Sequence, residues 1–180
     1  MAKETKEAPF EAVIVDGGRI PFQRSGSGYK KLMAYDLGRM AIEGLIGRSE
    51  INGKDLDRVI MGTVIQEVNT SNVARESALG AGIPNEVPAH TVTQACISSN
   101  QAITSAVELI RSGQAKIVLA GGTETMSDIP IRFRKKFRQK LLDARKYKSI
   151  SDFLKFFKGL RPSDLLPDIP AISEFSTGET

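Results

Sequence analysis

The apolar residues along the chain form two patterns. Some stand in short continuous runs, and others recur with a helical period over longer stretches. The short runs are residues 12–16, 58–65, 91–93 and 116–120, and each predicts a buried β-strand. The periodic stretches are residues 36–47, 71–81 and 97–111, and each predicts an amphipathic helix. Gly82 and Pro84 stop the second helix, and Gly113 suits the C-terminal cap of the third.

The predicted elements alternate in the order β-α-β-α-β-α-β. An alternation of this kind predicts the α/β fold class, with a largely parallel sheet and right-handed crossovers. The strand at 91–93 is so short that its orientation stays open. The chain has 180 residues, which is enough for about one domain with a sizeable core.

The character of the sequence changes after the fourth predicted strand, from apolar to charged and aromatic. We therefore divide the chain into an N-terminal extension (1–11), a core domain (12–125) and a basic C-terminal segment (126–180). Residues 132–161 carry twelve Lys and Arg against two Asp, a local charge of +10 in a chain whose formal net charge is +4. Apolar side chains recur in this block near helical spacing, at Phe133, Phe137, Leu141, Leu142, Phe153, Phe156 and Phe157. The block predicts amphipathic basic helices facing an anionic partner, a phosphate-bearing ligand or solvent.

The cysteine and histidine content limits the chemistry that the chain can perform. One Cys and one His allow neither an intrachain disulfide nor a zinc cluster, so we expect no metal site. No apolar run approaches the roughly 18 residues that span a bilayer. The first ten residues lack an apolar stretch and contain two Glu, which argues against a signal or transit peptide. We therefore expect a cytoplasmic protein, with a mitochondrial location as the alternative if a presequence has been removed.

Cys96 lies where the strand at 91–93 turns into the helix that begins near residue 97. The unpaired N–H groups and the positive end of the helix dipole stabilise a thiolate at such a position, which suits a nucleophile. The alternative is that Cys96 is a small buried apolar residue. His90, the only histidine, is six residues earlier, roughly 15 to 20 Å away along an extended strand and beyond hydrogen-bond reach.

Five segments together resemble the thiolase family and, within it, the β-oxidation type found in trifunctional complexes. They are residues 16–22 (DGGRIPF), 62–66 (GTVIQ), 72–75 (NVAR), 87–102 (VPAHTVTQACISSNQA) and 120–130 (AGGTETMSDIP). The resemblance implies a thiolase-like N-terminal core domain followed by the start of an inserted loop domain.

The resemblance also implies an activity, in which Cys96 is the catalytic nucleophile. A thiolase is an acyltransferase that cleaves a 3-ketoacyl-CoA with CoA, through an acyl-enzyme, to acetyl-CoA and a shortened acyl-CoA in fatty-acid β-oxidation. Coenzyme A is a co-substrate there, and no cofactor is tightly bound. In the family a histidine, an asparagine and a second cysteine from the C-terminal half complete the site. None of their motifs occurs here, so we expect this chain to be a fragment that is inactive alone.

The partners follow from the same resemblance. We expect acyl-CoA and CoA as ligands, a homodimer or higher homo-oligomer for the full protein, a hydratase/dehydrogenase subunit, and membrane contact through residues 132–161, but no nucleic acid. Two other functions stay open, a condensing enzyme of the same fold and a binding module that uses the basic segment. Asn72 and Arg75 are expected to be structural. Ser98, Ser99 and Asn100 either satisfy free N–H groups or let the helix approach the reacting centre.

Overall fold

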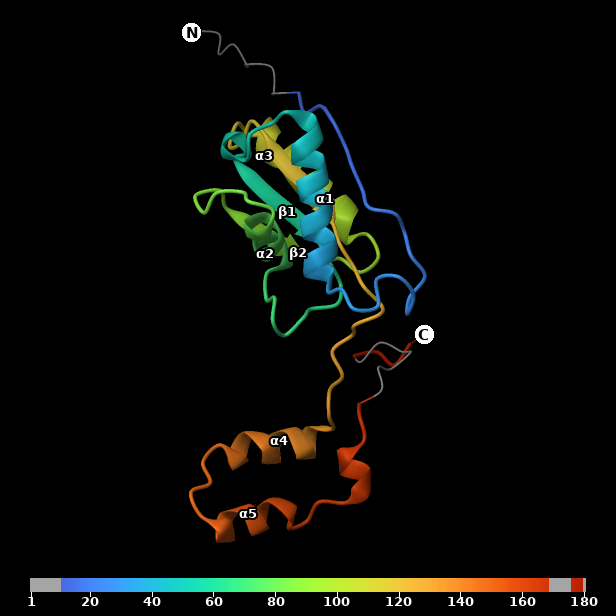
Figure 1. Ribbon diagram of the computed structural model, residues 1–180, viewed down its shortest axis with the longest axis vertical. Helices are drawn as coiled ribbons and strands as arrows, with labels where there is room; N and C mark the ends of the chain where they lie inside the picture. Colours follow the sequence, from blue (N-terminus) through green and yellow to red (C-terminus); the bar gives the residue numbers. More distant parts are fainter. Residues whose placement is uncertain (1–10, 169–175, 180) are drawn as a thin grey trace, which may run out of the picture. The chain divides into compact units, whose positions relative to one another are not determined.

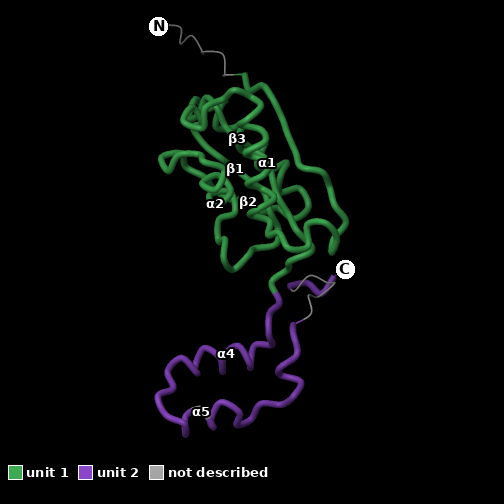
Figure 2. The backbone as a smooth tube through the Cα atoms, viewed as in Figure 1, with its two compact units in different colours: residues 1–130 green, residues 131–180 purple. Residues whose placement is uncertain are grey.

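The computed structural model describes residues 11–168 and 176–179, and the chain divides into two compact units, residues 1–130 and 131–180 (Figure 2). Among the described residues, the first unit contains strands β1 (Arg58–Gly62), β2 (Ala89–Val92) and β3 (Val118–Gly122). Its helices are α1 (Ala34–Ser49), the short 3-10 helix η1 (Gly53–Asp55), α2 (Val73–Gly80) and α3 (Ser98–Arg111) (Figure 1). The second unit contains α4 (Lys135–Ala144), α5 (Ile150–Phe157) and the 3-10 helix η2 (Pro162–Leu165).

The described strands form one parallel sheet in the order β2-β1-β3, so that β1 is central. Ile60 of β1 lies opposite His90 of β2 and Ala120 of β3. The chain passes from the central strand β1 through α2 to β2 at one edge of the described sheet. It then passes through α3 to β3 at the other edge. Right-handed crossovers in opposite directions place their helices on opposite faces. The predicted α/β class is confirmed, and the strand whose orientation the sequence left open is parallel.

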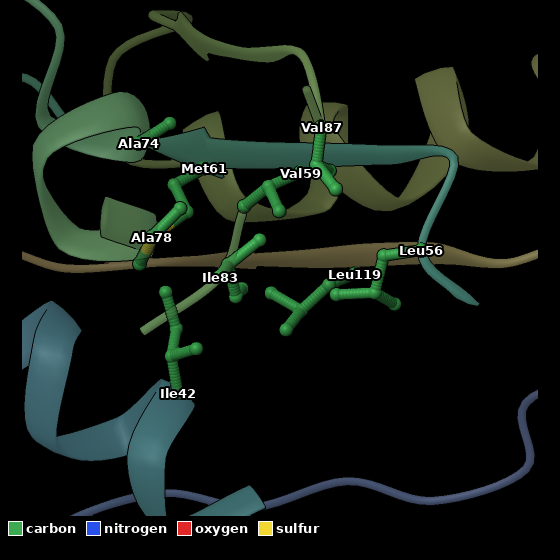
Figure 3. Close-up of a cluster of buried hydrophobic side chains, with 9 residues drawn as sticks. All are labelled: Ile42, Leu56, Val59, Met61, Ala74, Ala78, Ile83, Val87 and Leu119. Carbon is green, nitrogen blue, oxygen red and sulfur yellow. The ribbon is translucent and has the colours of Figure 1, made fainter. Parts of the chain in front are cut away.

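Side chains of β1 alternate between two hydrophobic clusters, one on each face of the sheet. Val59 and Met61 point toward α1 and α2 (Figure 3). This cluster consists of Ile42, Leu56, Val59, Met61, Ala74, Ala78, Ile83, Val87 and Leu119. Ile60 points to the opposite face and packs against Ala102 and Ala106 of α3. Burial on both faces explains why β1 is a continuous apolar run in the sequence.

The first predicted strand, residues 12–16, is wrong. These residues form no strand in the described structure, and Val13, Ile14 and Val15 are 68%, 85% and 82% exposed. The Arg48 guanidinium at the end of α1 donates to the Asp16 carboxylate (2.9 Å) and holds the segment beside that helix. An apolar run becomes a strand only where it pairs with a sheet edge, and this one pairs with none of the described strands. The other six predicted elements of the core are present, with shifted ends.

The second unit contains two short helices joined through an aromatic cluster. The Phe137 ring on α4 meets the rings of Phe133 and Phe156 edge-on, at centroid distances of 5.0 and 5.9 Å. Aromatic rings prefer this arrangement to face-to-face stacking. Two helices are therefore present in the predicted block, and their apolar positions hold α4 against α5. Only α4 is basic, because α5 carries one Lys and one Asp.

Two lysines of α4 point toward the C-terminal end of α5. Lys140 Nζ donates to the carbonyls of Lys155 (3.0 Å) and Lys158 (2.7 Å), and Lys136 Nζ donates to the Gly159 carbonyl. A cation at a helix C-terminus satisfies unpaired carbonyls and interacts favourably with the helix dipole. Part of the basic block therefore stabilises the unit internally.

The first turn of α3 lies directly on the ends of β1 and β3, at two glycines. A Cβ atom at Gly62 would lie 2.3 Å from the Ser98 carbonyl carbon, and one at Gly122 would lie 2.0 Å from Ser99 Oγ. Neither distance leaves room for a side chain. These two glycines therefore set how closely the helix approaches the sheet.

Asp57 joins β1 to β3 at the opposite end of the strand pair. Its carboxylate accepts the N–H groups of Lys116 (2.6 Å) and Ile117 (3.0 Å), directly before β3. These hydrogen bonds, led by that from Ile117, lower the pKa of Asp57 because they stabilise its charged form.

The substitution Gly62→Ala is expected to lower the free energy of unfolding by about 2 kcal/mol or more, because the new methyl group collides with backbone that cannot move aside. Urea denaturation measures the change. Gly44→Ala on α1 is the matched control, since a Cβ atom at Gly44 would meet no atom within 4 Å. This control should raise stability by about 0.5 to 1 kcal/mol. Equal stability of the Gly62 variant and the unmodified chain would contradict the close approach.

Asp57→Asn is expected to destabilise the fold more at about pH 7 than at about pH 3. The folded pKa of Asp57 is below its usual value, so its contribution is present above the unfolded pKa and is lost as the pH falls through the folded pKa. Urea denaturation at both pH values measures the difference. Asp55→Asn on η1 controls for the loss of one charge. A destabilisation of equal size at both pH values would show that the charge of Asp57 is not responsible.

Candidate active site

A buried serine holds the turn that precedes α3. Ala95 has φ +45°, in the left-handed region, which costs a non-glycine residue about 1 kcal/mol or more. The Gln94 N–H donates to Ser98 Oγ (2.8 Å), and the Ser98 hydroxyl donates to the Ala95 carbonyl (2.7 Å). These two hydrogen bonds link the strained turn to Ser98, which is only 4% exposed at the start of α3.

The Cys96 thiol is exposed at the end of this turn and lines a cavity of about 630 Å³. The other walls are the loop that follows β1 (62–65), the segment that follows β3 (122–126) and Phe22. The carboxyl ends of parallel strands thus converge on the thiol. In open α/β sheets ligands bind in the crevice outside these strand ends. The cavity is therefore the candidate active site.

Glu124 connects two walls of the cavity. Its carboxylate accepts the N–H groups of Val64 (2.7 Å) and Ile65 (3.2 Å) and the Thr63 hydroxyl (3.3 Å). The segment after β3 thereby holds the loop after β1. No local pattern in the sequence predicts this contact, because about 60 residues separate the partners.

Two large apolar side chains lie at the edge of the same cavity. Phe22 is 84% exposed and Met126 is 63% exposed, and both line the cavity beside Cys96. The segment that carries Phe22 is fastened to the segment after β3, because the Ser25 hydroxyl donates to the Met126 carbonyl (2.9 Å). The arrangement offers apolar contacts to a ligand that approaches the thiol.

Asn72 and Arg75 fasten α2 to the strand that leads toward Cys96. Asn72 Oδ1 accepts the Thr91 hydroxyl (2.8 Å), and its amide donates to the Ala89 carbonyl (3.0 Å). The Arg75 guanidinium donates to the Val87 carbonyl (2.8 Å). Both side chains therefore act within the fold, and neither lines the cavity.

His90 lies in a different place, as its spacing from Cys96 predicts. It lines a separate hollow of about 350 Å³ together with Arg58 and Glu108. Burial and the nearby Arg58 cation lower the pKa of His90. Within the part of the chain that the structure describes, the cavity at Cys96 contains no histidine, and Glu124 is its only other side chain that titrates as an acid. No group of three or more His, Cys, Asp or Glu among these residues could hold a metal ion.

The chain is similar to proteins of one family over most of its length. Residues 12–155 match the family described as "Thiolase, N-terminal domain". The mitochondrial trifunctional enzyme subunit beta of Bos taurus is 56% identical over 168 residues, which are 93% of this chain and 35% of that protein. A probable 3-ketoacyl-CoA thiolase of Caenorhabditis elegans is 47% identical over 168 residues, or 93% of this chain and 38% of that protein.

A solved structure shows the same similarity. The crystal structure of the Bacillus anthracis acetyl-CoA acetyltransferase matches with a TM-score of 0.68 and 30% identity, over 71% of this chain and 33% of that chain. The chain thus spans about a third of the length of each of these proteins. Because the family match covers most of the chain and the fold agrees, the chain belongs to the thiolase family and carries that family's N-terminal domain.

Proposed function

We propose that the protein containing this chain is a 3-ketoacyl-CoA thiolase, with Cys96 as its nucleophile. The observation that carries the proposal is the exposed thiol at the start of α3, held over a cavity at the carboxyl ends of the strands. The names of the relatives support the substrate class, and they favour a thiolase over a condensing enzyme of the same fold. The co-substrate is CoA.

The proposed reaction begins when the Cys96 thiolate attacks the keto carbon of the substrate. The tetrahedral oxyanion collapses, the bond between that carbon and its neighbour breaks, and the electron pair leaves with acetyl-CoA as an enolate, which takes up a proton. The acyl group stays on Cys96 as a thioester. The sulfur of CoA then attacks this thioester and releases the Cys96 thiolate. The position at the N-terminus of α3 suits both states in which the sulfur is negative.

The groups that protonate the enolate and bind the oxyanion are not supplied by this chain in our proposal. We assign these roles to a histidine, an asparagine and a second cysteine in the C-terminal half of the full-length protein. We further propose that residues 126–180 begin an inserted loop domain. This division would leave the chain inactive alone.

The names of the relatives support a location and an assembly for the full-length protein. We propose a mitochondrial location in place of the cytoplasmic one expected from the sequence, because the cattle relative is named as mitochondrial. Since that relative is a subunit of a trifunctional enzyme, we also propose a homo-oligomer that assembles with a hydratase/dehydrogenase subunit.

The second unit supports a further proposal, peripheral contact with a membrane. Ile150, Leu154 and Phe157 follow one another along a single face of α5 and are 85%, 70% and 65% exposed. A helix with an exposed apolar face can lie in the interface of an anionic bilayer, and the cations elsewhere in residues 132–161 favour approach to such a surface. None of the helices in the described residues is both long enough and apolar enough to cross a membrane.

The product of the full reading frame is expected to cleave acetoacetyl-CoA and a long-chain 3-ketoacyl-CoA in the presence of CoA, whereas the 180-residue chain is not. Cys96→Ala should lower the rate at least about a thousandfold, because it removes the sulfur that forms the acyl-enzyme in the proposed reaction. Loss of the 3-ketoacyl-CoA enolate absorbance measures the rate.

Val68→Ser is the control for this assay, since Val68 is 85% exposed and lies outside the cavity. This variant should keep the unmodified rate. A folded full-length product that cleaves neither substrate would contradict the proposal and favour the binding module.

For the membrane contact, the double substitution Ile150→Ser and Leu154→Ser is expected to weaken partition into vesicles of phosphatidylcholine and phosphatidylglycerol by about tenfold or more, because two apolar contacts are lost. Sedimentation with vesicles measures the partition. Val68→Ser again serves as the control, because it removes an equally exposed side chain from the first unit. Unchanged partition of the double variant would count against this face of α5.

A further inference from the structure

Two carboxylates hold the strand pair of β1 and β3, one at each end. Asp57 accepts the consecutive N–H groups of residues 116 and 117 before β3. Glu124 accepts the consecutive N–H groups of residues 64 and 65 after β1. At both ends a single carboxylate accepts two consecutive backbone N–H groups. Only the Glu124 end faces the cavity of Cys96.

Glu124 is itself firmly anchored, so it can fix the loop that it binds. The neighbouring Thr123 N–H donates to the Gly62 carbonyl (3.0 Å), and the Thr123 hydroxyl donates to the Ala34 carbonyl on α1 (2.7 Å). The loop on the other side leaves the sheet just after the Thr63 N–H, which donates to the Val92 carbonyl (3.2 Å). Beyond that bond, the N–H groups of residues 64 and 65 donate to the Glu124 carboxylate.

The thiol and this loop are positioned independently of each other. Ser98 and the packing of α3 fix the turn of Cys96, whereas Glu124 fixes residues 63–65 across the cavity. Loss of Glu124 should therefore leave the thiol in place but loosen the wall that faces it.

We propose that Glu124 is a positioning residue for thiolysis, whose carboxylate holds residues 63–65 as the wall against which the CoA-bearing substrate is oriented at Cys96. This inference rests on the proposed function. It separates the reaction of Cys96 with CoA-bearing reagents, which needs the wall, from its reaction with small reagents, which does not.

The test uses the full 180-residue chain, in which Cys96 is the only cysteine and therefore the only thiol that can react. The probe is the mixed disulfide of CoA with 2-nitro-5-thiobenzoate. The Cys96 thiolate attacks the CoA sulfur, a new sulfur–sulfur bond forms, and the coloured aryl thiolate leaves with the electron pair of the old bond. The same disulfide with cysteamine in place of CoA is the small reagent.

Glu124→Ala is expected to slow the reaction with the CoA disulfide about tenfold relative to the cysteamine disulfide. Glu124→Gln keeps one acceptor oxygen and should restore an intermediate ratio. Amide hydrogen exchange at residues 64 and 65 should become about tenfold faster in Glu124→Ala. Asp57→Ala, the matched control at the other end of the strands, should lower the denaturation midpoint without changing the ratio of the two rates.

The proposal is overturned if Glu124→Ala slows both disulfides equally, if it changes neither, or if Asp57→Ala changes the ratio as much. The comparison with the cysteamine disulfide also distinguishes failure of the Glu124 proposal from failure of the proposed thiolase function. Equal rates with both disulfides in the unmodified chain would overturn the role of Glu124 in orienting CoA, whereas thiolysis by the full-length product decides the proposed function. Hydrogen exchange at residues 64 and 65 decides independently whether Glu124 holds the loop, and unchanged exchange would overturn that role.

Discussion

The contact between the backbone of α3 and the ends of β1 and β3 determines the geometry around Cys96. It exists because Gly62 and Gly122 carry no side chains where the helix begins. With the first turn fixed at this distance, Ser98 is buried and its hydroxyl can reach back to the Ala95 carbonyl. The strained turn at Ala95 then leaves the next residue, Cys96, exposed at the carboxyl edge of the sheet. The position of the proposed nucleophile thus depends on the absence of side chains at Gly62 and Gly122.

The described strands have only four or five residues each, so much of their backbone lies near a strand end, where the N–H groups need partners. Here the partners are carboxylates next to the neighbouring strand. Asp57 lies directly before β1 and binds the start of β3, and Glu124 lies just after β3 and binds the loop after β1. A carboxylate that accepts two consecutive N–H groups fixes the direction of the chain as well as its distance. The cavity wall at residues 64 and 65 is therefore held by the same interaction that holds the opposite end of the strand pair, a carboxylate that accepts two consecutive N–H groups.

Local patterns in the sequence predicted what local physics determines. Helical periodicity indicated α1, α2 and α3, and the boundary between strand and helix placed Cys96. The strand expected at 12–16 failed because strand pairing depends on a distant partner, which apolar spacing does not reveal. Glu124 was missed for the same reason, since its bonds cross about 60 residues. For Ser98 and Ser99 the sequence left two roles open. In the structure Ser98 accepts the Gln94 N–H and Ser99 lies against Gly122 of the sheet, while a role at the reacting centre stays a prediction.

The basic segment shows why a local charge does not by itself identify a partner. Lys136 and Lys140 neutralise the C-terminal end of α5, and other cations of the unit pair with Asp143 and Asp152. A sum of +10 over residues 132–161 therefore overstates the charge that is free to attract a ligand. What distinguishes the surface of this unit is the apolar face of α5, whose side chains stay exposed while Lys136 and Lys140 of α4 donate to carbonyls at the C-terminal end of that helix. In the membrane contact proposed above, charge favours approach to the anionic surface, and burial of the apolar face of α5 supplies the binding energy.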